Sequence, residues 1–192
     1  MNFAILIMAA GLSQRFRKLN GGHKLRALLQ GKPVLQHTLE KAIVTEMDVY
    51  VVSRPEDRDI HLLASRAQLI TVASNGLGHS IAAGVAATSD YDGWLIVLGD
   101  MPLLTTSSYL AVARALQTSP LVRSEVQGMP GHPVGFQKPF YAELIQLEGD
   151  NGARALLSRH PVTPVKLTDL GCLKDVDTPA MLSLLAQRLS EE

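Results

Sequence analysis

Residues 3–16 read FAILIMAAGLSQRF. The six apolar residues at 3–8 predict a buried strand, and the small residues after them predict a tight loop at its end. Small residues let backbone N–H groups approach an anion closely, and Arg15 and Lys24 place two cations nearby. This segment therefore predicts a loop that binds the phosphates of a nucleotide.

The predicted loop belongs to neither of two common nucleotide-binding types. A P-loop has four residues between its glycines and then Lys-Ser/Thr, a pattern that residues 9–24 lack. A dinucleotide-binding loop has the form G-x-G-x-x-G. The one suitably placed G-x-G, at residues 76–78, has Ile81 where the third glycine would stand. The phosphate-binding prediction therefore rests on the small residues and the two cations.

Composition limits the class of protein. With 46% apolar and 19% charged residues among 192, we expect one globular domain over residues 1–192. Zero net charge favours neither nucleic acid nor an anionic membrane as a partner. Cys172 is the only cysteine, which excludes an internal disulfide. No apolar run reaches the roughly 18 residues of a membrane span, and no signal peptide is indicated, so we expect a cytoplasmic protein.

Strand-like and helix-like segments alternate along the chain, which predicts an α/β fold with three α/β/α layers and a mostly parallel sheet. The predicted strands are residues 3–8, 49–53, 68–73 and 94–98, with weaker signals at 133–137 and 163–167. The predicted helices are residues 34–46, 79–88, 106–117 and 179–190. Residues 120–132 hold two prolines and two glycines and are expected to form a loop or the flank of a hairpin.

Ligands of such sheets bind beyond the carboxyl ends of the strands, so the loops there are the candidate site. Asp100 directly follows the strand at 94–98, and Pro102 disfavours helix just after it. A carboxylate in this place could hold Mg²⁺ together with substrate phosphates. The alternative is that Asp100 caps a turn or the helix at 106–117.

Three further loops carry candidate binding residues. Residues 74–80, SNGLGHS, precede a helix and expose backbone donors, and Asn75 could bind a base or ribose. His132 lies among the prolines and glycines of 128–133, and Arg154 lies at a predicted helix start suited to a phosphate. Each feature has a structural alternative: a capped helix start, a histidine without chemistry, or a surface arginine.

Asp175 and Asp177 precede the helix at 179–190. If the segment is extended, we expect only one of the two carboxylates to face the site. The alternative is that Asp177 or Thr178 caps that helix.

Taken together and in this order, these blocks resemble the molybdopterin nucleotidyltransferases, which have the Rossmann-like, sugar-nucleotidyltransferase-like fold. Ala9-Ala10-Gly11 and the aspartates 175 and 177 favour the cytidylyltransferase branch, because guanylyltransferases typically carry Ala-Gly-Gly and asparagines there. The matching blocks read MAAGLSQRF (8–16), KL (24–25), GKPVL (31–35), GLGHSI (76–81), LGDMP (98–102), GHP (131–133), GDNGAR (149–154) and DVDTP (175–179).

The resemblance implies an enzyme that transfers CMP from CTP to the phosphate of molybdopterin, the organic part of the molybdenum cofactor, and releases pyrophosphate. It implies Mg²⁺ as cofactor, held by Asp100 and Asp177, and a recipient molybdoenzyme as a further partner. Arg15, Lys24 and Asp100 would be catalytic, and His132 and Arg154 would bind the acceptor. The nucleotide would be bound by Ala9, Ala10, Gly11, Leu12, Ser13, Lys24, Asn75, Gly78 and Ser80.

Three other functions fit the sequence. The nucleotide could be GTP, or the acceptor could be another phosphorylated compound such as a sugar phosphate. The protein could also be a non-catalytic carrier of the molybdenum cofactor. The presence of Asp100, Lys24 and Arg15 together favours an enzyme over a carrier.

Overall fold

A computed structural model describes residues 1–20 and 22–190. Seven strands form one sheet in the order β5-β4-β1-β6-β8-β7-β9, and two short strands pair separately. The seven strands are β1 (Phe3–Met8), β4 (Asp48–Ser53), β5 (Gln68–Thr71), β6 (Gly93–Leu98), β7 (Leu121–Val126), β8 (Met129–Gln137) and β9 (Thr163–Leu167). The short pair is β2 (Leu28–Leu29) and β3 (Lys32–Pro33).

Helices connect these strands, and those predicted from apolar spacing are present within a few residues of their expected bounds. The helices are α1 (Gln14–Asn20), α2 (Val34–Ile43), α3 (Arg58–Leu63), α4 (Leu77–Ala87), α5 (Thr106–Leu116), α6 (Tyr141–Leu144), α7 (Arg154–Arg159) and α8 (Pro179–Ser190). Short 3-10 helices occupy Lys138–Phe140 and Leu170–Leu173.

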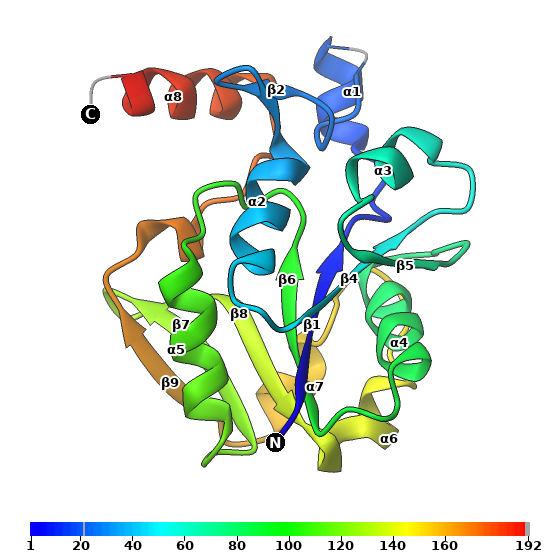
Figure 1. The fold of residues 1–192 in the computed structure, drawn as a ribbon, viewed down its shortest axis with the longest axis vertical. Coiled ribbons are helices and arrows are strands. Elements are labelled where there is room, and N and C mark those ends of the chain that lie inside the picture. Colours follow the sequence, from blue (N-terminus) through cyan, green and yellow to red (C-terminus); the bar gives the residue numbers. More distant parts are fainter. Residues whose placement is uncertain (21, 191–192) are drawn as a thin grey trace.

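The sheet is mostly parallel. β8 pairs antiparallel with both β6 and β7, and every other pairing in the sheet is parallel. All strands except β8 therefore end at the same edge, where α1, α3 and α8 lie (Figure 1). The predicted three-layer α/β/α fold with a mostly parallel sheet is confirmed.

Two apolar cores sandwich the sheet, one on each face. In β1 the side chains of Ile5 and Ile7 join the core beneath α2 and α5, while Leu6 and Met8 join the core beneath α4, α6 and α7. Figure 1 shows α2 and α5 in front of the sheet in this view. Burial on both faces explains why β1 is apolar at every position instead of alternating.

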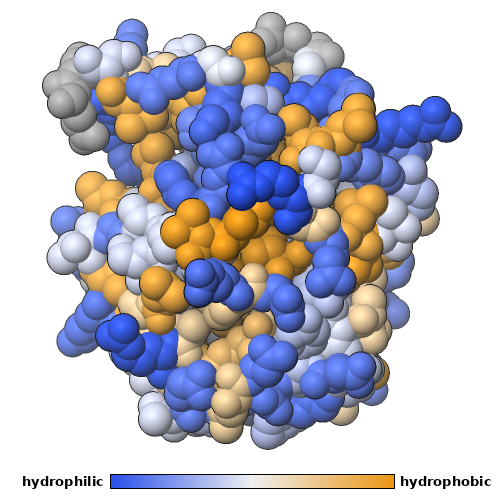
Figure 2. Space-filling view, viewed as in Figure 1, coloured by the Kyte–Doolittle hydropathy of each residue, from blue (hydrophilic) through white to orange (hydrophobic). Residues whose placement is uncertain are grey.

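The outer surface mixes polar and apolar side chains. Figure 2 shows apolar surface near the middle of the face that α2 and α5 cover, and Val44 and Leu110 are exposed next to or within those helices. Single exposed apolar side chains are ordinary on a protein surface. Across residues 1–20 and 22–190, no helix has the length and apolar character needed to cross a bilayer.

Residues 120–132 differ from one of the two structures expected for them. They form β7 and the start of β8, joined by a two-residue turn in which Gln127 and Gly128 both have positive φ. The hairpin expectation is therefore confirmed and the loop expectation is wrong. As a result, His132 lies within a strand, and Gly131 packs so closely on the Cys172 carbonyl that a Cβ would collide with it.

Asp169 caps helix α5 from a distant segment. Its Oδ2 accepts hydrogen bonds from the Thr105 N–H (2.9 Å), the Thr105 hydroxyl (2.8 Å) and the Ser108 hydroxyl (2.7 Å). Burial alone would raise the Asp169 pKa, but these hydrogen bonds outweigh burial and hold the pKa below its ordinary value. The Asp100 carboxylate instead pairs with Lys24 through Oδ2 and has no partner at Oδ1 among the described residues, so the expectation that it caps this helix is wrong.

Replacing Asp169 tests this capping role. We expect Asp169→Ala to lower the free energy of unfolding at pH 7 by about 2–4 kcal/mol, the scale of several hydrogen bonds to a charged group. Because the folded-state pKa is depressed, the stabilisation is present above the unfolded pKa and is lost as the pH falls through the folded pKa. Urea denaturation of wild type, Asp169→Ala and the exposed control Asp90→Ala measures this. If this cap does not stabilise the fold, all three proteins will have the same free energy of unfolding at pH 7.

Candidate active site at the carboxyl edge of the sheet

The loop after β1 is anchored to both neighbouring strands. The Ala9 N–H donates to the Val52 carbonyl (2.7 Å), and the Gly99 N–H donates to the Met8 carbonyl (2.9 Å). Ala9 and Ala10 are buried, whereas Gly11 and Leu12 are exposed. Ser13 has a positive φ of 52° and turns the chain into α1. The loop thus has a fixed base and an outward-facing tip, as expected of a loop that binds a ligand.

Lys24 lies at the centre of a charged cluster. Its Nζ hydrogen-bonds the Asp100 carboxylate and lies 3.1 Å from Asp177 Oδ1. Burial alone would lower the Lys24 pKa, but the charges and hydrogen bonds of the two carboxylates outweigh burial and raise the pKa above its ordinary value. Lys24 is therefore stabilised as an ammonium ion within this cluster.

The position of Asp100 is fixed by its backbone neighbours. The Thr38 hydroxyl donates to the Gly99 carbonyl (2.9 Å), and the Val176 N–H donates to the Asp100 carbonyl (2.9 Å). Burial raises the Asp100 pKa against the opposing effect of the Lys24 ammonium. Asp100 Oδ1 is buried and has no hydrogen-bond partner within the described residues. A buried carboxylate oxygen without a partner suits a metal ion.

Three carboxylates converge at this point. One oxygen each of Asp100, Asp175 and Asp177 lies within 4.8 Å of the other two. The expectation that only one of Asp175 and Asp177 faces the site is wrong, because residues two apart in extended backbone share a face. Val176 lies between them with a fully buried side chain. Hard oxygen ligands of this kind fit Mg²⁺ or Mn²⁺.

The hydrogen bonds and ion pairs around this triad leave Asp177 free of a helix-capping role, which agrees with a functional one. The Thr178 hydroxyl accepts from the Met181 N–H (3.2 Å) and caps α8, so Asp177 does not. Arg15 Nη1 lies 3.2 Å from Asp177 Oδ2, and its side chain is 77% exposed. The structure therefore brings together all four residues predicted to be catalytic or metal-binding: Arg15, Lys24, Asp100 and Asp177.

The loop 74–80 is shaped by its own small residues. The Ser80 hydroxyl is buried and pairs with the Ser74 hydroxyl (2.6 Å), and the Gly78 N–H donates to the Gly149 carbonyl (2.8 Å). Ser80 and Gly78 thus have packing roles in this loop. Asn75 is exposed beside them. The nucleotide contacts of these three residues stay predictions.

Sequence reasoning missed Arg54, which joins two of the predicted loops. Its Nε donates to the Ala10 carbonyl (2.9 Å), and its Nη2 donates to the Ser74 carbonyl. Arg54 directly follows β4, so the rule that sites lie at the carboxyl ends of strands points to it. Nothing in the sequence indicates which carbonyl groups it contacts.

A cavity of about 530 Å³ lies between β8 and the starts of α4 and α7. His132 and Arg154, both predicted to bind an acceptor, line it together with apolar residues of α4, β6, β8 and α7. Burial, assisted by the nearby Arg123 charge, lowers the His132 pKa to about 4. His132 is therefore neutral at pH 7 and can donate or accept a hydrogen bond without carrying charge.

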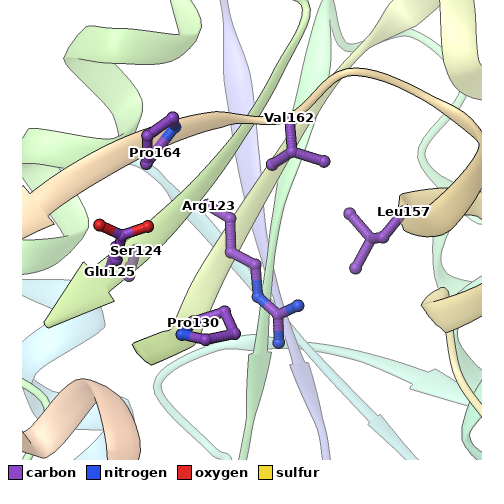
Figure 3. Close-up of a pocket in the computed structure, with 7 residues that line it drawn as sticks. All are labelled: Arg123, Ser124, Glu125, Pro130, Leu157, Val162 and Pro164. Carbon is purple, nitrogen blue, oxygen red and sulfur yellow. The ribbon is translucent and has the colours of Figure 1, made fainter. Parts of the chain in front are cut away.

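Arg123 is a second residue that sequence reasoning missed, because its segment was expected to include a loop. It lines this cavity and also a smaller recess of about 240 Å³, and its Nε donates to the Gly131 carbonyl (3.0 Å). Figure 3 shows the guanidinium between Pro130 and Leu157, apart from the Glu125 carboxylate. Within the part of the chain described, Arg123 forms no ion pair. Its terminal nitrogens are thus available to a ligand.

Comparison with known proteins agrees with this geometry. The MobA-like NTP transferase domain matches residues 5–165. The chain belongs to this family. A MobA-like NTP transferase is a nucleotidyltransferase, which confirms the enzyme class and the family relationship that the sequence blocks indicate.

Two curated relatives of this MobA-like protein are cytidylyltransferases. It is 25% identical to the molybdenum cofactor cytidylyltransferase of Escherichia coli over 97% of this chain and 96% of that protein. It is 26% identical to the 3-deoxy-manno-octulosonate cytidylyltransferase of Alteromonas mediterranea over 84% of this chain, which spans 64% of that protein.

Solved structures share the fold. Rv0371c of Mycobacterium tuberculosis superposes with a TM-score of 0.84 at 21% identity, covering 97% of this chain and 98% of that one. A second structure of Rv0371c is a complex with manganese (TM-score 0.82, 20% identity, 97% and 99% coverage).

The acidic triad predicts metal binding that can be measured directly. We expect Asp100→Asn to weaken Mn²⁺ binding, followed by electron paramagnetic resonance, by about 10-fold or more, because one anionic ligand is lost. Asp175→Asn should weaken it as well, since all three carboxylates converge. Asp90→Asn is the control with the same loss of charge. Equal Mn²⁺ affinity in all four proteins would exclude the triad as a metal site.

Proposed function

We propose that this nucleotidyltransferase transfers CMP from CTP to the phosphate of molybdopterin, forming molybdopterin cytosine dinucleotide and pyrophosphate. The observation that carries the proposal is the cluster of Lys24, Arg15 and the aspartate triad at the phosphate loop, beside a mostly apolar cavity with cations at its wall. The similarity to the E. coli molybdenum cofactor cytidylyltransferase supports the choice of substrates.

The reaction is an in-line displacement at phosphorus. A phosphate oxygen of the acceptor forms a bond to the α-phosphorus of CTP, and the bond from that phosphorus to the β-phosphate bridging oxygen breaks. Pyrophosphate leaves with the bonding electrons. The acceptor phosphate is already an anion, so no strong general base is needed, and catalysis depends on positioning and charge neutralisation.

The chain supplies both. Backbone N–H groups of residues 10–13 bind the triphosphate, and Lys24 and Arg15 neutralise the charge that grows on the leaving pyrophosphate. Asp100, Asp175 and Asp177 hold Mg²⁺, which when bound supplies positive charge at the phosphates. His132, Arg154 and Arg123 face the acceptor. A cytoplasmic molybdoenzyme would then receive the product.

The choice of base is the first test. The Cβ of Ala10 leaves less room beside the loop for a two-ring purine base. We therefore expect kcat/KM to be about 10-fold or more higher with CTP than with GTP or ATP. Pyrophosphate release with molybdopterin and each nucleotide in turn measures this. Ala10→Gly should narrow the difference and keep activity. Equal kcat/KM for CTP and GTP in the wild type would leave only the general nucleotidyltransferase assignment.

Replacing Arg123 tests the proposal that the cavity binds the acceptor. A half-buried guanidinium whose terminal nitrogens face the cavity suits the anionic or carbonyl oxygens of the acceptor. We expect Arg123→Gln to raise the KM for molybdopterin by about 10-fold and to leave the KM for CTP within about two-fold. The exposed Arg114→Gln is the control for loss of charge. A rise in the KM for CTP instead would place Arg123 in the nucleotide site.

A sugar derivative is the second candidate acceptor, because one relative is a 3-deoxy-manno-octulosonate cytidylyltransferase, and octulosonate is a sugar acid. Leu77, Ile81 and Leu98 offer apolar surface that suits a ring system, which favours molybdopterin over a sugar. A carrier would bind the cofactor without releasing pyrophosphate, so the same assay separates a carrier from an enzyme.

A further inference from the structure

Arg54 is rigidly held between two segments that are far apart in the sequence. Its side chain is 15% exposed, and its carbonyl accepts from His61 Nε2 (2.9 Å) and from the Asp57 N–H (3.2 Å). The nearest carboxylate, that of Glu56, lies 3.9 Å from Nη1, and the Glu56 side chain is 65% exposed. The guanidinium therefore acts mainly on the Ala10 and Ser74 carbonyls.

The bond to Ala10 has a geometric consequence for the phosphate loop. In a trans peptide the carbonyl and the following N–H point in opposite directions. Because Arg54 holds the Ala10 carbonyl (Nε to O, 2.9 Å), the Gly11 N–H must point to the opposite side. Gly11 is exposed at the tip of the loop, so a phosphate can reach this donor.

The bond to Ser74 fixes the second loop relative to the first. Ser74 is buried and precedes Asn75, the residue predicted to bind the base or ribose. One guanidinium thus spans the loop for the phosphates and the loop for the nucleoside. Arginine suits this task, because its planar fork of N–H donors can reach two carbonyl groups at once, whereas an ammonium group is a compact point charge.

We propose that Arg54 is a positioning residue for the nucleotide: it presets the Gly11 donor and sets the separation between the loops at 9–13 and 74–80. This inference rests on the proposed function, in which these loops bind CTP. Arg54 touches no reacting atom and acts through the backbone of Ala10 and Ser74.

The test is calorimetric binding of CTP with Mg²⁺ and no acceptor. We expect Arg54→Ala and Arg54→Lys each to weaken CTP binding by about 10-fold or more, because charge-assisted hydrogen bonds to the loops are lost. Arg54→Lys keeps the charge and the aliphatic stem, so it separates the loss of the fork from a loss of folding. Arg66→Lys, an exposed arginine elsewhere, should bind CTP like the wild type.

Rescue separates positioning from general stability. Dilute guanidinium ion should restore CTP affinity to Arg54→Ala by refilling the vacated site, whereas the same ionic strength of sodium chloride should not. A wild type that fails to bind CTP would overturn the proposed function, and this inference with it. A wild type that binds CTP no better than Arg54→Lys would overturn this inference alone.

Discussion

The carboxylates of Asp100, Asp175 and Asp177 repel one another at the carboxyl edge of the sheet, and the fold has to offset this repulsion. Like charges less than 4.8 Å apart repel by roughly 3 kcal/mol or more per pair at an effective dielectric constant of about 20. The Lys24 ammonium offsets part of this repulsion, and it joins segments 76 and 153 residues away in the sequence. The site therefore depends on the whole α/β fold, which brings the end of β6 and the start of α8 to one point.

The sequence predicted β1, β4 and β6 well because these strands are buried along most of their length and hence mostly apolar. β7 was harder to predict. It carries Arg123, Ser124 and Glu125, and polar residues in a row do not suggest a strand. Ser124 is nonetheless fully buried, and its hydroxyl donates to the Pro133 carbonyl (3.0 Å). This cross-strand hydrogen bond satisfies a buried hydroxyl within the hairpin, and it leaves no periodic pattern in the sequence.

The same distinction applies to the site. Asp100 could be predicted because it follows the end of the apolar strand β6, and Arg15 and Lys24 because they follow the small-residue loop after β1. Asp175 was discounted by a wrong assumption about which side of an extended segment it faces. Arg54 and Arg123 were missed for a different reason. Arg54 acts by binding backbone carbonyl groups of other segments, and Arg123 lines a cavity that other segments help to form. Backbone acceptors carry no sequence signal, so residues that act on them become visible only in the fold.

The contact between the loop at 74–80 and the segment at 148–149 limits how this enzyme could evolve. A Cβ at Gly76 would collide with the Gly149 carbonyl, and a Cβ at Gly78 would come within 2.5 Å of the Glu148 carbonyl oxygen. Substitutions in this loop could thus occur at Asn75 or Leu77 but not at the two glycines. The backbone at 148–149 leads towards α7 and the cavity that His132 and Arg154 line, so a change that displaced this backbone would also alter the shape of that cavity.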